Sequence, residues 1–144
     1  MGTESLTYTT NSVNQYIAIT GTGELSYDED GNLIEKSDTR YSWNAENRLV
    51  TVAPQSPAPG DTRAEFVYDY MGRRVRTSVY TYSGTWQESE TRLFVYDANG
   101  NVGQMVDAED GTMAAAYEYD PYGNLLRADG EYASENPFRF STKY

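Results

Sequence analysis

The chain contains neither cysteine nor histidine among its 144 residues. Without cysteine it has no disulfides, no thiol nucleophile and no thiolate metal ligand. Without histidine it lacks the commonest general base and the commonest metal ligand. Paired carboxylates such as Asp28 with Asp30 remain, but acids beside a glycine turn usually form the turn itself. We therefore predict that the protein is not an enzyme and holds no metal or other cofactor.

Positive charge and long apolar runs are also scarce. Eleven lysines and arginines face 22 aspartates and glutamates, which gives a net charge of -11. Such a charge repels phosphate backbones and anionic membrane surfaces, so we expect no nucleic-acid partner. No run of about 18 apolar residues is present to cross a bilayer, so we expect no membrane partner. The first residues lack the basic region and apolar stretch of a secretory signal peptide.

What the chain does contain is a repeated sequence motif, here called the phrase. In it an aromatic residue precedes an acid or amide, and a turn with glycine or asparagine follows. The phrase recurs at intervals of roughly 16 to 28 residues, which predicts one small unit copied along the chain and stacked on its neighbours. Its defining residues are Tyr27, Asp28, Gly31, Trp43, Asn44, Tyr68, Asp69, Gly72, Tyr96, Asp97, Gly100, Tyr119, Asp120 and Gly123.

The chemistry of this phrase predicts a β-hairpin. Tyrosine and tryptophan favour pleated, half-buried surfaces, Asp and Asn bond to their own backbone at turns, and glycine supplies positive φ. The pairs at 30–31, 99–100 and 110–111 read Asp-Gly or Asn-Gly, which predicts two-residue type I′ turns. Residues 112–127 contain an alanine run, but Tyr117, Tyr119 and Pro121 interrupt it and favour strand. We predict an all-β fold of consecutive antiparallel hairpins in a curved or spiral sheet.

The domain organisation predicted from composition is a single β domain over residues 1–144. Residues 53–60 hold three prolines and a glycine, which favours a crossover or surface loop over a linker between two lobes. Residues 129–144 form a second irregular stretch. Phe138 and Phe140 lie on the same side of an extended segment there, and we expect them to plug one end of the core.

A small basic cluster is the clearest candidate for binding. Arg73, Arg74 and Arg76 stand beside Tyr70, and this group could stack on a glycan or bind the carboxylates of a protein partner. The alternative is that these arginines pair with neighbouring acids. The tyrosine rows also have a binding interpretation and a structural one. They could form a glycan-binding surface, or they could form the ladder that joins adjacent hairpins.

The repeated phrases are similar to the YD repeats of the RHS family. The similarity rests on residues 27–33, 43–50 and 119–125, and the tail 135–144 resembles the start of that family's core-associated region. The resemblance implies a spiral of hairpins that forms the wall of a large hollow shell, as in secreted bacterial toxins, insecticidal toxin complexes and teneurins. It also implies an extracellular or cell-surface location in a bacterium.

Two departures from the family pattern limit what the resemblance implies. The sequence is too short to close a shell alone, and it ends before the Asp-Pro-x-Gly-Leu region where family members cut themselves, so neither cargo nor self-cleavage is expected. Asp120-Pro121-Tyr122-Gly123 resembles that motif superficially. Because it stands in register with the other YD turns, we interpret Asp120 as a turn residue.

A short spiral of hairpins has an unpaired strand at each end, and such edges pair with other chains unless they are blocked. We therefore expect homo-oligomers formed by edge-strand pairing, with head-to-tail contacts that generate an extracellular filament or tube. The net charge of -11 opposes this association, so salt should promote it. The alternatives are a fragment of a toxin-encapsulating shell and a surface module that binds glycan or protein.

Overall fold

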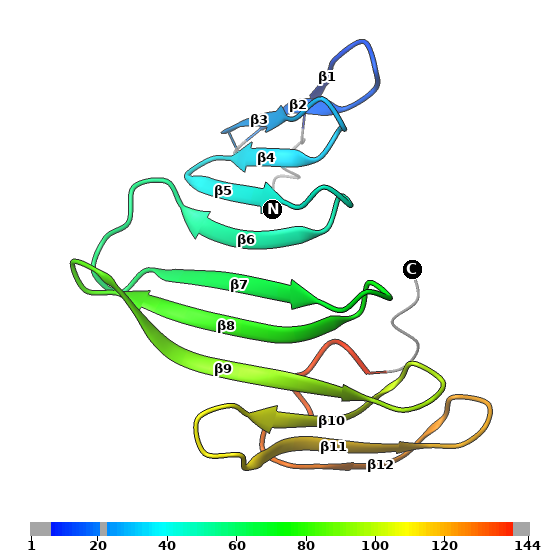
Figure 1. Ribbon diagram of the computed structural model, residues 1–144. Coiled ribbons are helices and arrows are strands. Elements are labelled where there is room, and N and C mark those ends of the chain that lie inside the picture. Colours follow the sequence, from blue (N-terminus) through cyan, green and yellow to red (C-terminus); the bar gives the residue numbers. More distant parts are fainter. Residues whose placement is uncertain (1–6, 21–22, 140–144) are drawn as a thin grey trace, which may run out of the picture.

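The computed structural model describes residues 7–20 and 23–139, and within them the regular structure consists entirely of β-strands. Twelve antiparallel strands form one open, curved sheet whose spatial order equals the sequence order (Figure 1). This result confirms the predicted fold class. The strands are β1 (Tyr8–Thr10), β2 (Tyr16–Ile19), β3 (Gly23–Tyr27), β4 (Leu33–Lys36), β5 (Thr39–Trp43), β6 (Leu49–Pro54), β7 (Thr62–Tyr68), β8 (Arg74–Tyr82), β9 (Trp86–Tyr96), β10 (Val102–Asp107), β11 (Met113–Tyr119) and β12 (Leu125–Asp129).

The sheet is a meander in which each strand pairs with the next strand along the chain. Its loops therefore alternate between two sides of the sheet. The loops after β1, β3, β5, β7, β9 and β11 all lie on the right-hand side of Figure 1. The YD turns consequently form one continuous row along a single side of the sheet, which we call the turn row.

The turns of this row differ from the predicted type I′ geometry. Gly31 and Gly100 have φ values of 86° and 83°, whereas Asp30 and Asn99, which precede them, do not have positive φ. The strand register shifts by one residue directly before these turns, for example between Ser26 and Tyr27. One positive φ with an adjacent bulge is the pattern of a three-residue loop with a G1 bulge. The two-residue prediction was wrong because Asp-Gly and Asn-Gly suit both turn classes.

The proline-rich segment is a loop between neighbouring strands. β6 continues through Pro54, which pairs with Thr39 of β5, and the chain then returns directly as β7. The loop predicted over residues 53–60 therefore begins two residues later, after Pro54, and it makes no crossover. The alanine-rich stretch is strand β11, as predicted.

Among the residues that the structure describes, fully buried side chains are confined to the C-terminal half of the sheet. After β12 the chain turns at Gly130, whose φ is 101°, and residues 130–139 pack back over one face of β9–β11. We call this the covered face, and the segment lies close to these strands in Figure 1. The hydrophobic core there consists of Phe94, Val102, Met105, Ala115, Tyr117 and Ala133.

The described part of the N-terminal half has no comparable core. Among the side chains that the structure describes before Ser78, none is buried. β6 is half-buried along its whole length, and β1 is exposed. A single-layer sheet without a covering element cannot exclude water from either face.

Candidate functional site

The turn row is built by one hydrogen-bond pattern that recurs at every YD turn. At Asp69 the backbone N–H donates to the Arg73 carbonyl oxygen at 2.9 Å, and Gly72 N–H donates to the Asp69 carbonyl oxygen at 3.0 Å. The Asp69 carboxylate accepts hydrogen bonds from the backbone N–H groups of Met71 and Arg73, both at 2.9 Å. The same arrangement occurs at Asp28, Asn44, Asp97 and Asp120.

These hydrogen bonds lower the pKa of the turn carboxyls. At Asp120 the side-chain amide of Asn124 donates to the carboxylate at 2.7 Å, and this bond is the main reason that the pKa of Asp120 lies below its usual value. At Asp69 and Asp97 burial raises the pKa, but backbone and side-chain donors outweigh burial and lower it. The turn acids therefore stabilise the fold as carboxylates, which fits the structural role predicted for them.

The aromatic residues of four of the five phrases tie their repeat to the one before. Tyr68 Oη donates to the Leu49 carbonyl oxygen at 2.8 Å, and Tyr96 Oη donates to the Arg74 carbonyl oxygen at 2.6 Å. Tyr27 and Trp43 make equivalent bonds to Tyr16 and Leu33. At these four positions a polar aromatic suits the fold better than phenylalanine, because the ring carries a donor that joins adjacent repeats.

A sixth turn of the same kind was missed in the sequence. Asn11 N–H donates to the Gln15 carbonyl oxygen at 2.9 Å, the Asn11 side chain accepts from Val13 and Gln15 N–H, and Asn14 has a positive φ of 63°. Thr10 stands where the other phrases have tyrosine or tryptophan. The Asn-x-x-Asn spacing of this turn matches that of Asn44 and Asn47, and this spacing was the available signal.

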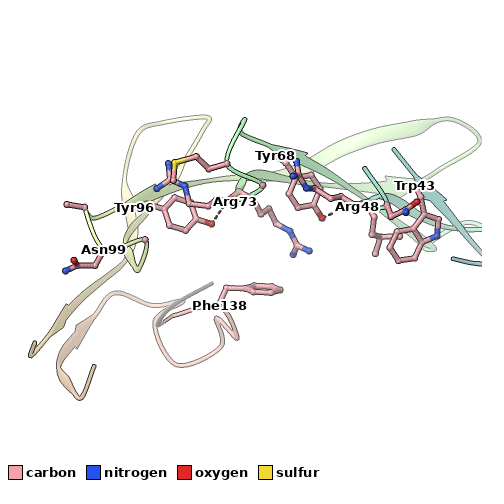
Figure 2. Close-up of a pocket in the computed structure, with 14 residues that line it drawn as sticks. Trp43, Arg48, Tyr68, Arg73, Tyr96, Asn99 and Phe138 are labelled. Carbon is pink, nitrogen blue, oxygen red and sulfur yellow. Dashed lines mark hydrogen bonds between the residues drawn. The ribbon is translucent and has the colours of Figure 1, made fainter. Parts of the chain in front are cut away.

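The sheet also forms a groove beneath the central turns. Its volume is about 750 Å³, and its walls come from β5–β9, their turns and Phe138 of the C-terminal segment. Figure 2 shows Trp43, Arg48, Tyr68, Arg73 and Tyr96 arranged along the sheet, with Phe138 facing them from the other side. The groove is therefore lined mainly by aromatic rings and guanidinium groups.

The structure separates the four residues predicted to bind a partner. Arg73 and Arg74 line the groove. Tyr70 lies at the tip of its turn, where 93% of its surface is exposed, and it does not line the groove. Arg76 pairs with Leu93 and is exposed; the register places it on the face opposite the covered face. The glycan or protein ligand itself stays a prediction.

The two groove arginines from this cluster have different surroundings. Arg73 forms an ion pair of 2.7 Å with Asp69, and its Cζ lies 4.8 Å from the centre of the Tyr96 ring. Arg74 makes none of the ion pairs found among the described residues. Its Cζ lies 4.1 Å from the centre of the Phe66 ring and 4.5 Å from that of Phe138. The expected pairing with a neighbouring acid therefore holds for Arg73 and fails for Arg74.

The described residues contain no group of three or more His, Cys, Asp or Glu side chains that could hold a metal ion. The same part of the chain contains no helix long and apolar enough to span a membrane. Of the two aromatics expected to plug the core, Phe138 packs against it, whereas Phe140 lies outside the described residues.

No family model matches the chain. Three curated relatives match at low identity: the tRNA3(Ser)-specific nuclease WapA of Bacillus spizizenii at 24%, the tRNA nuclease WapA of Bacillus subtilis at 25%, and the tRNA(Glu)-specific nuclease WapA of Bacillus subtilis subsp. natto at 24%. Each match covers 81% of this chain but only 6% of the relative. The chain is therefore similar to a small part of much longer proteins.

These relatives correct one sequence-based expectation. We predicted that the protein is not an enzyme, but all three matched relatives are named nucleases. The absence of histidine and cysteine was the basis of the error, because the composition of a short chain does not report the chemistry of the longer proteins it resembles.

Proposed function

We propose that the chain is a wall segment of a YD-repeat shell of the RHS type, in a toxin-related protein that acts outside the cell or at the surface of a bacterium. The relatives named as tRNA nucleases support this proposal, since a small segment of each resembles most of this chain. A unit that adds strands in sequence order, with one turn pattern throughout, suits a wall that lengthens repeat by repeat.

The observation that carries the proposal is that both ends of the sheet are open. Among residues 7–20 and 23–139, no strand pairs with the outer side of β1 or of β12. β1 is exposed throughout, and in β12 the side chains of Leu125 and Leu126 are 44% and 67% exposed. Open edges with apolar side chains are templates for further strands, and in a shell wall the next repeats would supply those strands.

Self-association is a second candidate, favoured by the same two edges. β12 of one copy could pair with β1 of the next copy, and this head-to-tail contact generates a filament or tube when the rotation does not close. The net charge of -11 per copy opposes the contact. Monovalent salt should therefore lengthen the assemblies, because it screens repulsion between copies.

Sedimentation velocity and negative-stain electron microscopy across protein and salt concentration test both ideas. We expect Leu126→Lys, at the exposed edge strand β12, to abolish association, and Leu93→Lys, on the exposed side of central strand β9, to leave it unchanged. A wild-type chain that stays monomeric at every salt concentration argues against self-association.

Hydrogen exchange of the monomeric chain tests the wall proposal separately. Backbone amides of β1 and of the outer side of β12 should exchange hydrogen rapidly, while those of β8 and β9, which are paired on both sides, exchange slowly. Slow exchange throughout β12 in a monomer would show that this edge is already covered, and the wall proposal would fail.

A further inference from the structure

The groove beneath the turn row contains one cation that no carboxylate of the described residues neutralises. Three arginines line it, and two have carboxylate partners: Arg48 pairs with Glu46 at 2.6 Å and Arg73 with Asp69 at 2.7 Å. No carboxylate of the described residues lies within ion-pair distance of Arg74. Its Nε is buried and has no hydrogen-bond partner.

The surroundings of Arg74 make this charge unusual. Its guanidinium lies over the rings of Phe66 and Phe138, and its Cζ is 5.9 Å from the centre of the Tyr68 ring. Contacts with ring faces attract the cation but do not satisfy its N–H donors as hydrogen bonds. An unpaired cation and an unsatisfied buried donor both cost free energy, and a bound anion would offset that cost.

The shape of the groove indicates which anion fits. Its volume of about 750 Å³ lies in the range of small-molecule sites. Tyr68, Tyr96 and Phe138 give it aromatic walls that suit an apolar body. The guanidinium is a planar fork of donors that matches a carboxylate in two parallel hydrogen bonds.

We propose that the groove is a binding site for a carboxylate carried on an aromatic or apolar body. The carboxylate pairs with Arg74, and the body packs against Tyr68, Tyr96 and Phe138. This inference is independent of the wall proposal, because it concerns the groove and not the sheet edges. The earlier prediction named only a glycan or a protein as the ligand. The present proposal specifies the chemical group that is bound, a carboxylate recognised by Arg74.

Fluorescence of Trp43 reports on binding, because Trp43 lines the groove. The only other tryptophan is Trp86, so in the Trp86→Phe background the tryptophan emission comes from Trp43 alone. We expect benzoate to change its fluorescence saturably, and its neutral counterpart benzamide to bind at least about tenfold more weakly, since only the carboxylate pairs with Arg74. Equal responses to benzoate and benzamide would overturn the proposal.

Arg74→Met keeps much of the apolar stem of this side chain and removes its charge. We expect benzoate affinity to fall by about tenfold or more. Arg76→Met is the matched control, because Arg76 is exposed on the same strand, β8, and faces away from the groove. Equal losses in both variants would show that general charge, not this site, binds the anion.

Two measurements keep the test informative if Arg74→Met does not fold. Arg74→Lys retains the charge but loses the planar fork, and we expect it to weaken benzoate binding several-fold. In the unmodified protein, the arginine Nε–H signals in an NMR titration should show a saturable shift of Arg74 with benzoate and none with benzamide. An unshifted Arg74 signal would contradict the proposal.

The source of the carboxylate is resolved by comparing benzoate with the blocked peptide acetyl-Phe-Glu-amide. Tighter binding of the peptide assigns the site to an acidic segment of polypeptide. Equal or tighter binding of benzoate assigns it to a free small molecule. Binding of neither compound overturns the proposal.

Discussion

The two halves of this sheet are built from the same repeat but are stabilised in different ways. In the C-terminal half, residues 130–139 cover one face and bury Val102 and Met105 almost completely. In the N-terminal half no described side chain before Ser78 is buried, and neighbouring repeats are joined by hydrogen bonds such as that from Tyr68 to Leu49. The difference shows that the repeat specifies a sheet, whereas a core requires a second layer.

The strongest test of this difference is to prevent the chain from folding back. Gly130 has a φ of 101°, and a methyl group there would overlap the Ala114 carbonyl oxygen. We expect Gly130→Ala to lower the free energy of unfolding of the covered half by about 4 kcal/mol or more, because backbone strain and steric overlap combine. Chemical denaturation with hydrogen exchange would locate the loss in β9–β11.

Gly84→Ala is the matched control for that substitution. Gly84 has a φ of 94°, but a methyl group there meets nothing within 4 Å. It should therefore cost only the strain, about 1–3 kcal/mol. Equal effects of the two substitutions would mean that residues 130–139 contribute little to the covered half.

A core truncation compares the halves directly. Met105 is 1% exposed, and Met105→Ala should cost about 3 kcal/mol because it leaves a cavity. Val52 lies in half-buried strand β6, and Val52→Ala should cost less than about 1.5 kcal/mol. Urea denaturation of both variants measures the two values, and a larger cost for Val52 would reverse our view of where the core lies.

The hydrogen bonds between repeats are tested by removing one hydroxyl. Tyr68→Phe loses the bond of 2.8 Å to the Leu49 carbonyl oxygen and should cost about 1 kcal/mol. Tyr122 is 89% exposed, so Tyr122→Phe should change stability by less than about 0.5 kcal/mol. If thermal denaturation shows no difference between them, the tyrosine bond does not join the repeats energetically.

Acid should weaken the two halves unequally. The pKa values of Asp69, Asp97 and Asp120 are lowered in the folded chain, so their contribution is full above the unfolded value of about 3.9 and is lost as the pH falls through the lower folded values. In the N-terminal half Asp28 and Asp69 share this shift, while the turns at Asn11 and Asn44 carry amides. In the C-terminal half Asp97, Asp110 and Asp120 all have lowered pKa values.

The expected result is a loss of stability below about pH 4 that is larger in the C-terminal half. The double variant Asp97→Asn with Asp120→Asn should reduce this loss, because asparagine supports the same turn at Asn44. Urea denaturation at pH 6 and pH 3 measures the change. An unaltered pH dependence in the double variant would exclude these two carboxyls as its source.

The parts of the fold that were predictable are those set by near neighbours in the chain. The five YD turns follow from an acid or amide that bonds to backbone two and four residues later, as at Asp97. The sixth turn was missed because Thr10 stands before Asn11, where the other five phrases have tyrosine or tryptophan. The predicted turn class was wrong because Asp-Gly and Asn-Gly suit both the two-residue type I′ turn and the three-residue loop with a G1 bulge.

The candidate site was predictable only in part. Arg73 and Arg74 are adjacent in sequence and were both proposed for binding, yet within the part of the chain that the structure describes only Arg73 of the two has a carboxylate partner. Tyr70 and Arg76 were grouped with them by proximity, but the bulge and the turn direct these two away from the groove. Phe138, which closes the groove opposite Tyr68 and Tyr96, comes from a segment more than forty residues later.

The sequence by itself determined the all-β class, the hairpin order and the position of the YD turns, since each depends on contacts within a few residues and on a period of two. The tertiary structure alone decided that the buried core lies in the C-terminal half, and that Arg74 lies between Phe66 and Phe138 with no carboxylate of the described residues beside it. These features depend on how distant segments pack against one another, and no local pattern in the chain encodes that packing.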